Sequence, residues 1–208
     1  MNAVLRAIET DKGANVTVNG GTYDCHDSDS ATFMIMNSPS SSFNYVTASG
    51  AGWVLDAINS WVDVVGGSYS RNKDVEVFIQ RPTLRASDNA TLNVTNADVT
   101  GTYCDVFVTG ATANLFGGTY TNTNEYIDQK PPLRSYESPA LKVWNGGTLS
   151  VNGATVDCTG GNAAISSGEP AGSDYDDQPA ASWSLRTARS KTANTAFISV
   201  RAKTPPQS

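Results

Sequence analysis

Carboxylate pairs are the side chains of this sequence that come nearest to a catalytic arrangement. Asp56 and Asp63 form one such pair, and Asp74 and Glu76 form another. Hydrolysis of a glycosidic bond needs two carboxyl groups about 5 to 9 Å apart, one of which acts as a general acid. Carboxylates along strand edges are usually solvated, however, and we interpret all four acids in that way. The sequence therefore predicts no catalytic residue.

Two acidic stretches suggest a metal site at first sight. Residues 24–29 read Asp-Cys-His-Asp-Ser-Asp, and a later stretch contains Asp174, Asp176 and Asp177. Zinc ligands usually follow CxxC-type or HxxxH-type spacings, whereas the candidates in 24–29 are adjacent. A calcium loop needs alternating oxygen ligands, a glycine and a distant glutamate, which are also missing. We interpret residues 24–29 as a polar turn after a strand, and we predict no metal and no cofactor.

The sequence contains no motif for a catalytic nucleophile or for phosphate binding. Neither GxSxG nor GxxxxGK[ST] is present. His26 directly follows Cys25, and neighbouring residues of a strand point to opposite faces. The other cysteines are Cys104 and Cys158, and an odd count excludes a complete disulfide framework. We expect three reduced, buried thiols.

An internal repeat indicates which elements position these side chains. Its five copies are NVTVNGGTYDC (15–25), WVDVVGGSYSR (61–71), TLNVTNADVTG (91–101), TANLFGGTYTN (112–122) and TLSVNGATVDC (148–158). An apolar column runs through Val18, Val64, Val94, Leu115 and Val151, and a second, five residues later, through Tyr23, Tyr69, Val99, Tyr120 and Val156. A step of two small residues separates the columns. Each copy therefore predicts two short strands joined by a sharp corner.

The composition agrees with an all-β protein rich in turns. Only 16% of the residues are charged, against about 25% in an average globular chain, and glycine (18), threonine (22) and asparagine (17) are abundant. Further strands are predicted between the copies, at 32–38, 52–58, 75–81, 104–110, 140–146 and 162–168. Strand-poor stretches at 38–51, 121–139 and 168–182 are predicted to be loops. The longer intervals between copies correspond to one coil with an insertion or to two coils.

The repeated GG-T-Y corner and its apolar columns resemble the right-handed parallel β-helix of the pectin-lyase-like superfamily over roughly residues 5–168. The resemblance implies a short β-helix of roughly six or seven coils with strands stacked in register. It carries no activity motif. Asp24 and Asp157 share a column of the repeat, but Ser70, Thr100 and Thr121 occupy that column between them, so the two acids are not neighbours. A β-sandwich or jelly roll is the alternative fold, and the regular corners argue against it.

We divide the chain into a body (1–168), a linker (169–179) and a basic C-terminal arm (180–208). Residues 178–208 contain five basic residues and no acidic one, whereas the rest of the chain is strongly acidic. Such an asymmetry predicts that the arm docks on an acidic partner. The residues expected to dock are Arg186, Arg189, Lys191, Arg201 and Lys203. The candidate contacts to a glycan or receptor are Tyr126, Tyr136 and Trp144.

The resemblance extends to the β-helices that bacteriophage spike and decoration proteins use, commonly as trimers. It implies a non-enzymatic virion protein, either a capsid decoration (cement) protein or a small spike, which docks by its arm on major capsid or tail proteins and binds host surface glycans. We expect a homotrimer without nucleic-acid or membrane partners. Because no apolar run approaches a membrane span or a secretory signal, we expect synthesis in the host cytoplasm. The alternative is a polysaccharide lyase or glycoside hydrolase of tailspike type.

Overall fold

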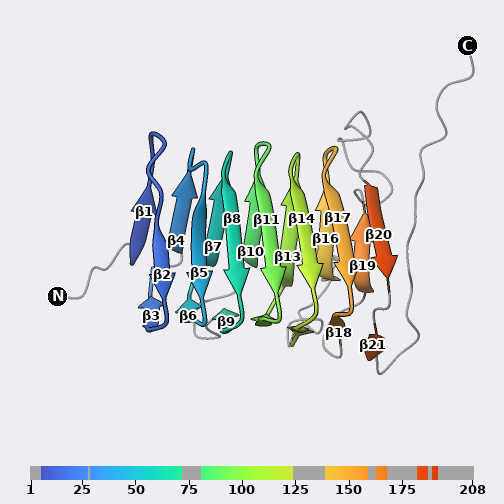
Figure 1. The fold of residues 1–208 in the computed structure, drawn as a ribbon. Coiled ribbons are helices and arrows are strands. Elements are labelled where there is room, and N and C mark those ends of the chain that lie inside the picture. The colour runs from blue at the N-terminus through green and yellow to red at the C-terminus, as the bar shows by residue number, and fades with distance from the viewer. Residues whose placement is uncertain are drawn as a thin grey trace, which may run out of the picture.

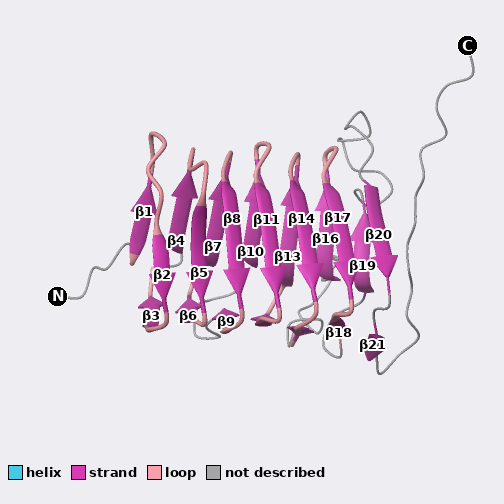
Figure 2. Cartoon of the chain, in the orientation of Figure 1, coloured by secondary structure: helices cyan, strands magenta, loops and turns pink. Residues whose placement is uncertain are grey.

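The computed structural model describes residues 6–27, 29–71, 81–123, 139–158, 163–167, 182–186 and 189–191, the last two segments as backbone only (Figure 1). Every regular element in the described part of the chain is a β-strand (Figure 2). The chain coils repeatedly through three sheets. The strands line up side by side along one axis, from β1 at one end to β20 and β21 at the other (Figure 1).

Each sheet takes every third strand of the chain, and all strand pairs are parallel. Sheet A contains β1 (Ile8–Thr10), β4 (Ala31–Met36), β7 (Trp53–Ile58), β10 (Pro82–Ser87), β13 (Cys104–Thr109), β16 (Pro139–Trp144) and β19 (Ala163–Ser167). Sheet B contains β2 (Thr17–Asn19), β5 (Ser41–Asn44), β8 (Trp61–Val65), β11 (Thr91–Thr95), β14 (Thr112–Phe116), β17 (Thr148–Asn152) and β20 (Ser182–Arg186). Sheet C contains β3 (Thr22–Cys25), β6 (Thr47–Gly50), β9 (Ser68–Arg71), β12 (Asp98–Gly101), β15 (Thr119–Asn122), β18 (Thr155–Asp157) and β21 (Arg189–Lys191).

This topology is a parallel β-helix of six to seven coils, as predicted, and it excludes the β-sandwich and jelly-roll alternative. A sandwich pairs antiparallel strands, whereas here each strand pairs in parallel with strands one coil before and one coil after it. Successive coils are spaced by the separation of neighbouring strands, about 4.8 Å. Each coil therefore contacts only its two neighbours.

The two apolar columns of the repeat lie inside the coil, stacked in register. The first column contains Val18, Phe43, Val64, Val94, Leu115 and Val151, all of them buried. The second contains Tyr23, Ala48, Tyr69, Val99, Tyr120 and Val156, of which all but Tyr23 are buried. The three cysteines are also buried, and none of them forms a disulfide bond, which agrees with the expected reduced thiols.

The corner between sheets B and C needs glycine for two reasons. Gly66 and Gly67 have positive φ angles of 60° and 86°, which residues with a Cβ seldom adopt. A Cβ on Gly67 would also collide with the backbone carbonyl oxygen of Val46 in the preceding coil. A Cβ on Gly66 would meet the ring of Tyr45, which lies over this corner. The small-residue step of the repeat is therefore the place where stacked corners come closest.

The stretch 38–51 is a coil of its own, and the loop predicted there is wrong. It contains β5 and β6, so the long first interval of the repeat corresponds to two coils. Few large apolar residues mark this coil, because Phe43 and Ala48 alone continue the two interior columns. The strand predicted at 75–81 lies almost entirely outside the described residues. The next described strand, β10, begins at Pro82, and the first residue of a strand is a position that tolerates proline.

Strand pairing continues past the boundary that the sequence predicts for the body. β20 pairs with β17 and β21 pairs with β18, both in parallel, so the coil extends into the predicted arm as far as Lys191. Residues 192–208 and the whole of the predicted linker (169–179) lie outside the described residues.

Candidate ligand-binding face

The outer side of sheet B carries three columns of outward-facing side chains, and we call it the sheet B face. Strand alternation places these columns between the buried interior residues. They consist of Trp61, Thr91, Thr112 and Thr148; of Thr17, Ser42, Asp63, Asn93, Asn114 and Ser150; and of Asn19, Asn44, Val65, Thr95, Phe116 and Asn152. Hydroxyl and amide groups therefore dominate the face.

A continuous hydrogen-bonded ladder runs along the middle column. The Asn114 side-chain amide donates to Asn93 Oδ1 at 2.9 Å, and the Asn93 amide donates to Asp63 Oδ1 at 2.7 Å. All bonds of this ladder point toward Asp63, because an ionised carboxylate can only accept hydrogen bonds. The carboxylate thereby fixes the orientation of both amides. The ladder joins three successive coils, those of β8, β11 and β14.

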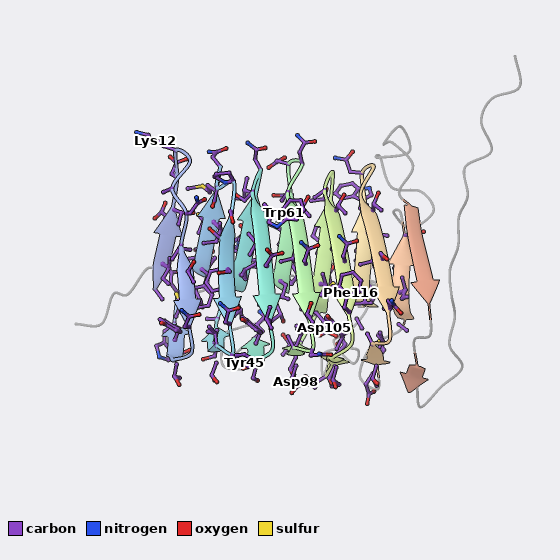
Figure 3. The ribbon with its side chains drawn as sticks, viewed as in Figure 1. Lys12, Tyr45, Trp61, Asp98, Asp105 and Phe116 are labelled. Carbon is purple, nitrogen blue, oxygen red and sulfur yellow. The ribbon has the colours of Figure 1, made fainter. Side chains whose placement is uncertain are left out.

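Two large aromatic side chains stand exposed on the same face. Trp61 is 48% exposed and Phe116 is 43% exposed. The indole Nε1 of Trp61 donates to both carboxylate oxygens of Asp63, at 3.2 and 3.1 Å, which holds the ring in a defined orientation. At the adjoining corner Tyr45 is 72% exposed. Figure 3 shows Trp61 near the upper ends of the strands, Phe116 toward their lower ends, and Tyr45 at the corner below.

The charge of the sheet B face is low. Among its outward positions from β2 to β17, Asp63 is the charged residue and the others are neutral. Arg186 in β20 continues the column of Phe116 and Asn152, two strands beyond β14. An exposed aromatic ring normally carries a cost in water, and rings grouped on one face often mark a binding surface. Fixed amides between such rings supply directional hydrogen bonds. The face therefore combines flat apolar surfaces with ordered polar groups.

The structure does not bring Asp56 and Asp63 together, because they lie on different sheets. Asp56 belongs to β7 in sheet A and is fully buried under Arg85 of the next coil. The Arg85 guanidinium donates to it through Nε at 2.7 Å and Nη2 at 2.5 Å. Burial raises the pKa of Asp56, and Arg85 opposes that shift. Arg85 and Arg81 also lie over the ring of Trp53.

Asp105 is a second buried acid, in β13 of sheet A, and its carboxyl group lies beside Gly101 at the end of β12. It has no exposed surface, and neither of its carboxyl oxygens accepts a hydrogen bond of normal length and angle. Burial raises the pKa of Asp105 well above its usual range, although the backbone of Gly101 beside it lowers that pKa in part. The hydroxyl of Tyr120 is likewise buried and without a partner. Apolar neighbours thus favour an uncharged Asp105.

Asp24 and Asp157 lie in one column of sheet C but are not neighbours, as the repeat predicts. Ser49, Ser70, Thr100 and Thr121 separate them, and Lys191 of β21 continues the column beyond Asp157. His26 Nε2 lies 2.9 Å from Asp24 Oδ2. The described residues contain no group of three His, Cys, Asp or Glu side chains that could hold a metal ion. They also contain no helix long and apolar enough to cross a membrane.

The predicted binding residues are only partly described. Trp144 lies on the outer side of sheet A, stacked against Phe107 with ring centroids 6.4 Å apart. The backbones of Arg186, Arg189 and Lys191 lie in β20 and β21. The other predicted contacts and acids lie outside the described residues, namely Tyr126, Tyr136, Arg201, Lys203, Asp74, Glu76, Asp174, Asp176 and Asp177.

The sequence does contain a signal that Trp61 and Phe116 are exposed. The signal lies in the outward-facing positions of the repeat, whereas the prediction of the fold rests on its interior positions. Trp61 occupies the position of Thr91 and Thr112 in other copies, and Phe116 occupies the position of Thr95. A position that otherwise holds threonine faces water, so an aromatic residue there must be exposed. Amino-acid type alone favours a core or rim location for tryptophan.

The class of protein that these observations define is a parallel β-helix with an aromatic and amide-rich outer face. No protein-family description, curated protein or solved structure matches this chain.

Proposed function

We propose that this protein is a non-enzymatic structural and binding element of a virion, a capsid decoration protein or small spike whose sheet B face binds surface polysaccharide. The observation that carries the proposal is the Trp61–Asp63–Asn93–Asn114 arrangement. It presents an exposed indole, held by a carboxylate, beside a ladder of oriented amides. A rigid scaffold of stacked coils holds these groups in fixed relative positions.

A polysaccharide fits the chemistry of this face better than an apolar partner does. A sugar ring has an apolar side of C–H groups, which stacks on an aromatic ring, and an edge of hydroxyls that both donate and accept hydrogen bonds. Trp61 supplies the first surface, and the side chains of Asn93 and Asn114 supply groups for the second. An apolar partner would displace water from the amides without replacing the hydrogen bonds that the water makes, which is unfavourable.

The separation of Asp56 and Asp63 supports binding without cleavage. Glycosidases place two carboxyl groups about 5 to 9 Å apart, flanking the bond that is cleaved. Asp63 faces outward from sheet B, whereas Asp56 is closed off by Arg85 on sheet A. Asp63 also accepts hydrogen bonds from Trp61 and Asn93. Its carboxylate oxygens therefore orient these two side chains.

The basic C-terminal residues support the proposed attachment to a virion. In this proposal they dock on an acidic surface of a major capsid or tail protein, and three chains assemble as a homotrimer. The charge of residues 178–208, opposite to that of the rest of the chain, is the feature that favours such docking.

Affinity electrophoresis tests the binding function directly. The protein is run through native gels that contain purified bacterial surface polysaccharides, and mobility is compared with a gel without polysaccharide. At least one polysaccharide is expected to retard the protein, and Trp61→Ala to abolish that retardation. Asp98→Asn is the control, because Asp98 is an exposed acid on sheet C (Figure 3). Retardation that survives Trp61→Ala but is lost in Trp144→Ala would move the site to sheet A.

A further inference from the structure

We propose that the ligand of the sheet B face is an uncharged polysaccharide that crosses three coils obliquely, from Trp61 on β8 to Phe116 on β14. This inference rests on the proposed function and specifies the ligand class and the path across the face. Three observations carry it: the relative positions of the two aromatic residues, the hydrogen-bonding capacity between them, and the charge of the face.

The two aromatic residues lie at opposite corners of a three-strand patch. Trp61 is the first residue of β8 and Phe116 is the last residue of β14, and β11 lies between these strands. Strand spacing and rise per residue place their Cα atoms about 16 Å apart. Figure 3 shows the two labelled side chains displaced from each other both along the strands and across them. This span suits an extended chain of several sugars rather than one ring.

Asn93 lies at the midpoint of the line between the two rings. It is the central residue of β11, two positions along from the register partner of Trp61 and two before that of Phe116. Its amide already donates one hydrogen bond to Asp63 and accepts one from Asn114. A side-chain amide has two donor hydrogens and two acceptor lone pairs, so a donor and an acceptor remain for sugar hydroxyls.

The charge of the face excludes acidic sugars as the preferred ligand. Among the outward positions of β8, β11 and β14, Asp63 is the charged residue, and it lies next to both Trp61 and Asn93. A uronate or sulfate group on this path would approach a carboxylate, and the three strands that the path crosses carry no basic residue at an outward position. Arg186 lies two strands beyond β14, outside the path. A neutral sugar meets no such repulsion, and its hydroxyls can donate to the Asp63 oxygens.

Ligand class is tested with six defined probes in affinity electrophoresis at low salt. Dextran, mannan and galactan are neutral, and alginate, polygalacturonate and hyaluronan are acidic. At least one neutral probe is expected to retard the protein, and none of the acidic probes. Thr112→Lys adds a cation to the face without removing a member of the ladder, and it is expected to create retardation by acidic probes. Retardation of the unmodified protein by acidic probes alone would overturn the inference while leaving polysaccharide binding intact.

The oblique path is tested with oligosaccharides of increasing length cut from the neutral probe that binds. Trp61→Ala is expected to weaken binding of every length about tenfold, which corresponds to the loss of one stacking contact. Phe116→Ala is expected to weaken only the oligosaccharides long enough to reach β14. Equal affinities of Phe116→Ala and the unmodified protein at all lengths would refute the path. A protein that none of the six probes retards would contradict both the inference and the polysaccharide-binding function on which it rests.

Discussion

The guanidinium of Arg85 covers the carboxylate of Asp56 on the neighbouring coil through two parallel hydrogen bonds. Asp56 is completely buried by this contact, although its side chain leaves the strand on the outer side of sheet A. The pair therefore fastens two coils together at the surface of the solenoid. Its two-pronged geometry is the arrangement that a guanidinium and a carboxylate favour.

Loss of Arg85 alone is expected to be costly. Arg85→Leu leaves the buried Asp56 carboxylate without its partner, and we expect the free energy of unfolding to fall by about 3 kcal/mol. Replacing both residues, as in Asp56→Leu with Arg85→Leu, removes the uncompensated charge and should restore most of that loss. Urea unfolding of the two single variants and the double variant measures this coupling. A cost below about 1 kcal/mol for Arg85→Leu would show that water reaches Asp56 once the arginine is gone.

Asp105 is expected to make stability depend on pH in the direction opposite to that of an ordinary acid. Burial raises the pKa of Asp105 in the folded protein above that of the unfolded chain, so folding favours the protonated form. Its contribution is therefore greatest below the unfolded value, near 3.8, and is lost as pH rises toward the raised folded value. Within that window the loss amounts to about 1.4 kcal/mol per pH unit.

The comparison of Asp105→Asn with the unmodified protein isolates this effect. Asparagine keeps the shape of the protonated acid and does not ionise, so the variant should gain stability relative to the unmodified protein as pH rises from 4 to 8. Denaturant unfolding at several pH values gives the difference curve. Asp98→Asn, at an exposed position, is the control for the removal of one carboxyl group. A flat curve for Asp105→Asn would mean that the carboxyl group is solvated in the folded state.

The corner glycines allow two effects of a Cβ to be separated. Gly67→Ala combines a positive φ with a collision against the Val46 backbone, whereas Gly20→Ala has a positive φ and open space around the new Cβ. We expect Gly20→Ala to lower the free energy of unfolding by about 1 kcal/mol and Gly67→Ala to lower it by clearly more. Thermal and urea unfolding provide the comparison. Equal losses would mean that the stacked corners move apart without penalty.

Truncation after Lys191 tests the role of the C-terminal residues while keeping every described strand. The shortened chain lacks Arg201 and Lys203 but retains β21, so its circular dichroism should remain β-rich. If these residues hold the proposed trimer together, the truncation should reduce the number of chains per particle, which light scattering gives as the measured molar mass divided by that of one chain. The double variant Arg201→Gln with Lys203→Gln separates the effect of charge from that of chain length. The same number of chains per particle for the full-length and truncated proteins would contradict the docking role.

The repeat made the interior of the fold predictable. Val64, Val94 and Leu115 could be placed in one column because strand alternation and a constant corner leave a single register that buries them all. The coil at 38–51 escaped prediction because five of its fourteen residues are serine and few are large and apolar. A coil needs only a few large side chains in the interior when its neighbours supply the rest. β10 was not predicted because Pro82 and Arg85 interrupt the pattern of apolar and polar residues that marks a strand.

The candidate site was harder to predict than the interior. The ladder from Asn114 to Asp63 joins residues that are far apart in sequence, and their proximity follows only when the three coils are set in register. The exposure of Trp61 depends on the same register. The burial of Asp105 has no sequence signal, because an acid between two apolar strand residues normally faces water.

Because each strand pairs only with its equivalents one coil away, the molecule can change length by duplication. Residues 91–111 span one complete short coil, from the start of β11 to the residue before β14. A tandem copy of this segment would insert a new layer with its own threonine, asparagine and corner, and all pairings on either side would be preserved. Duplication of one coil would therefore lengthen the sheet B face by one strand. The length of the face could change in this way without any change to the packing between existing coils.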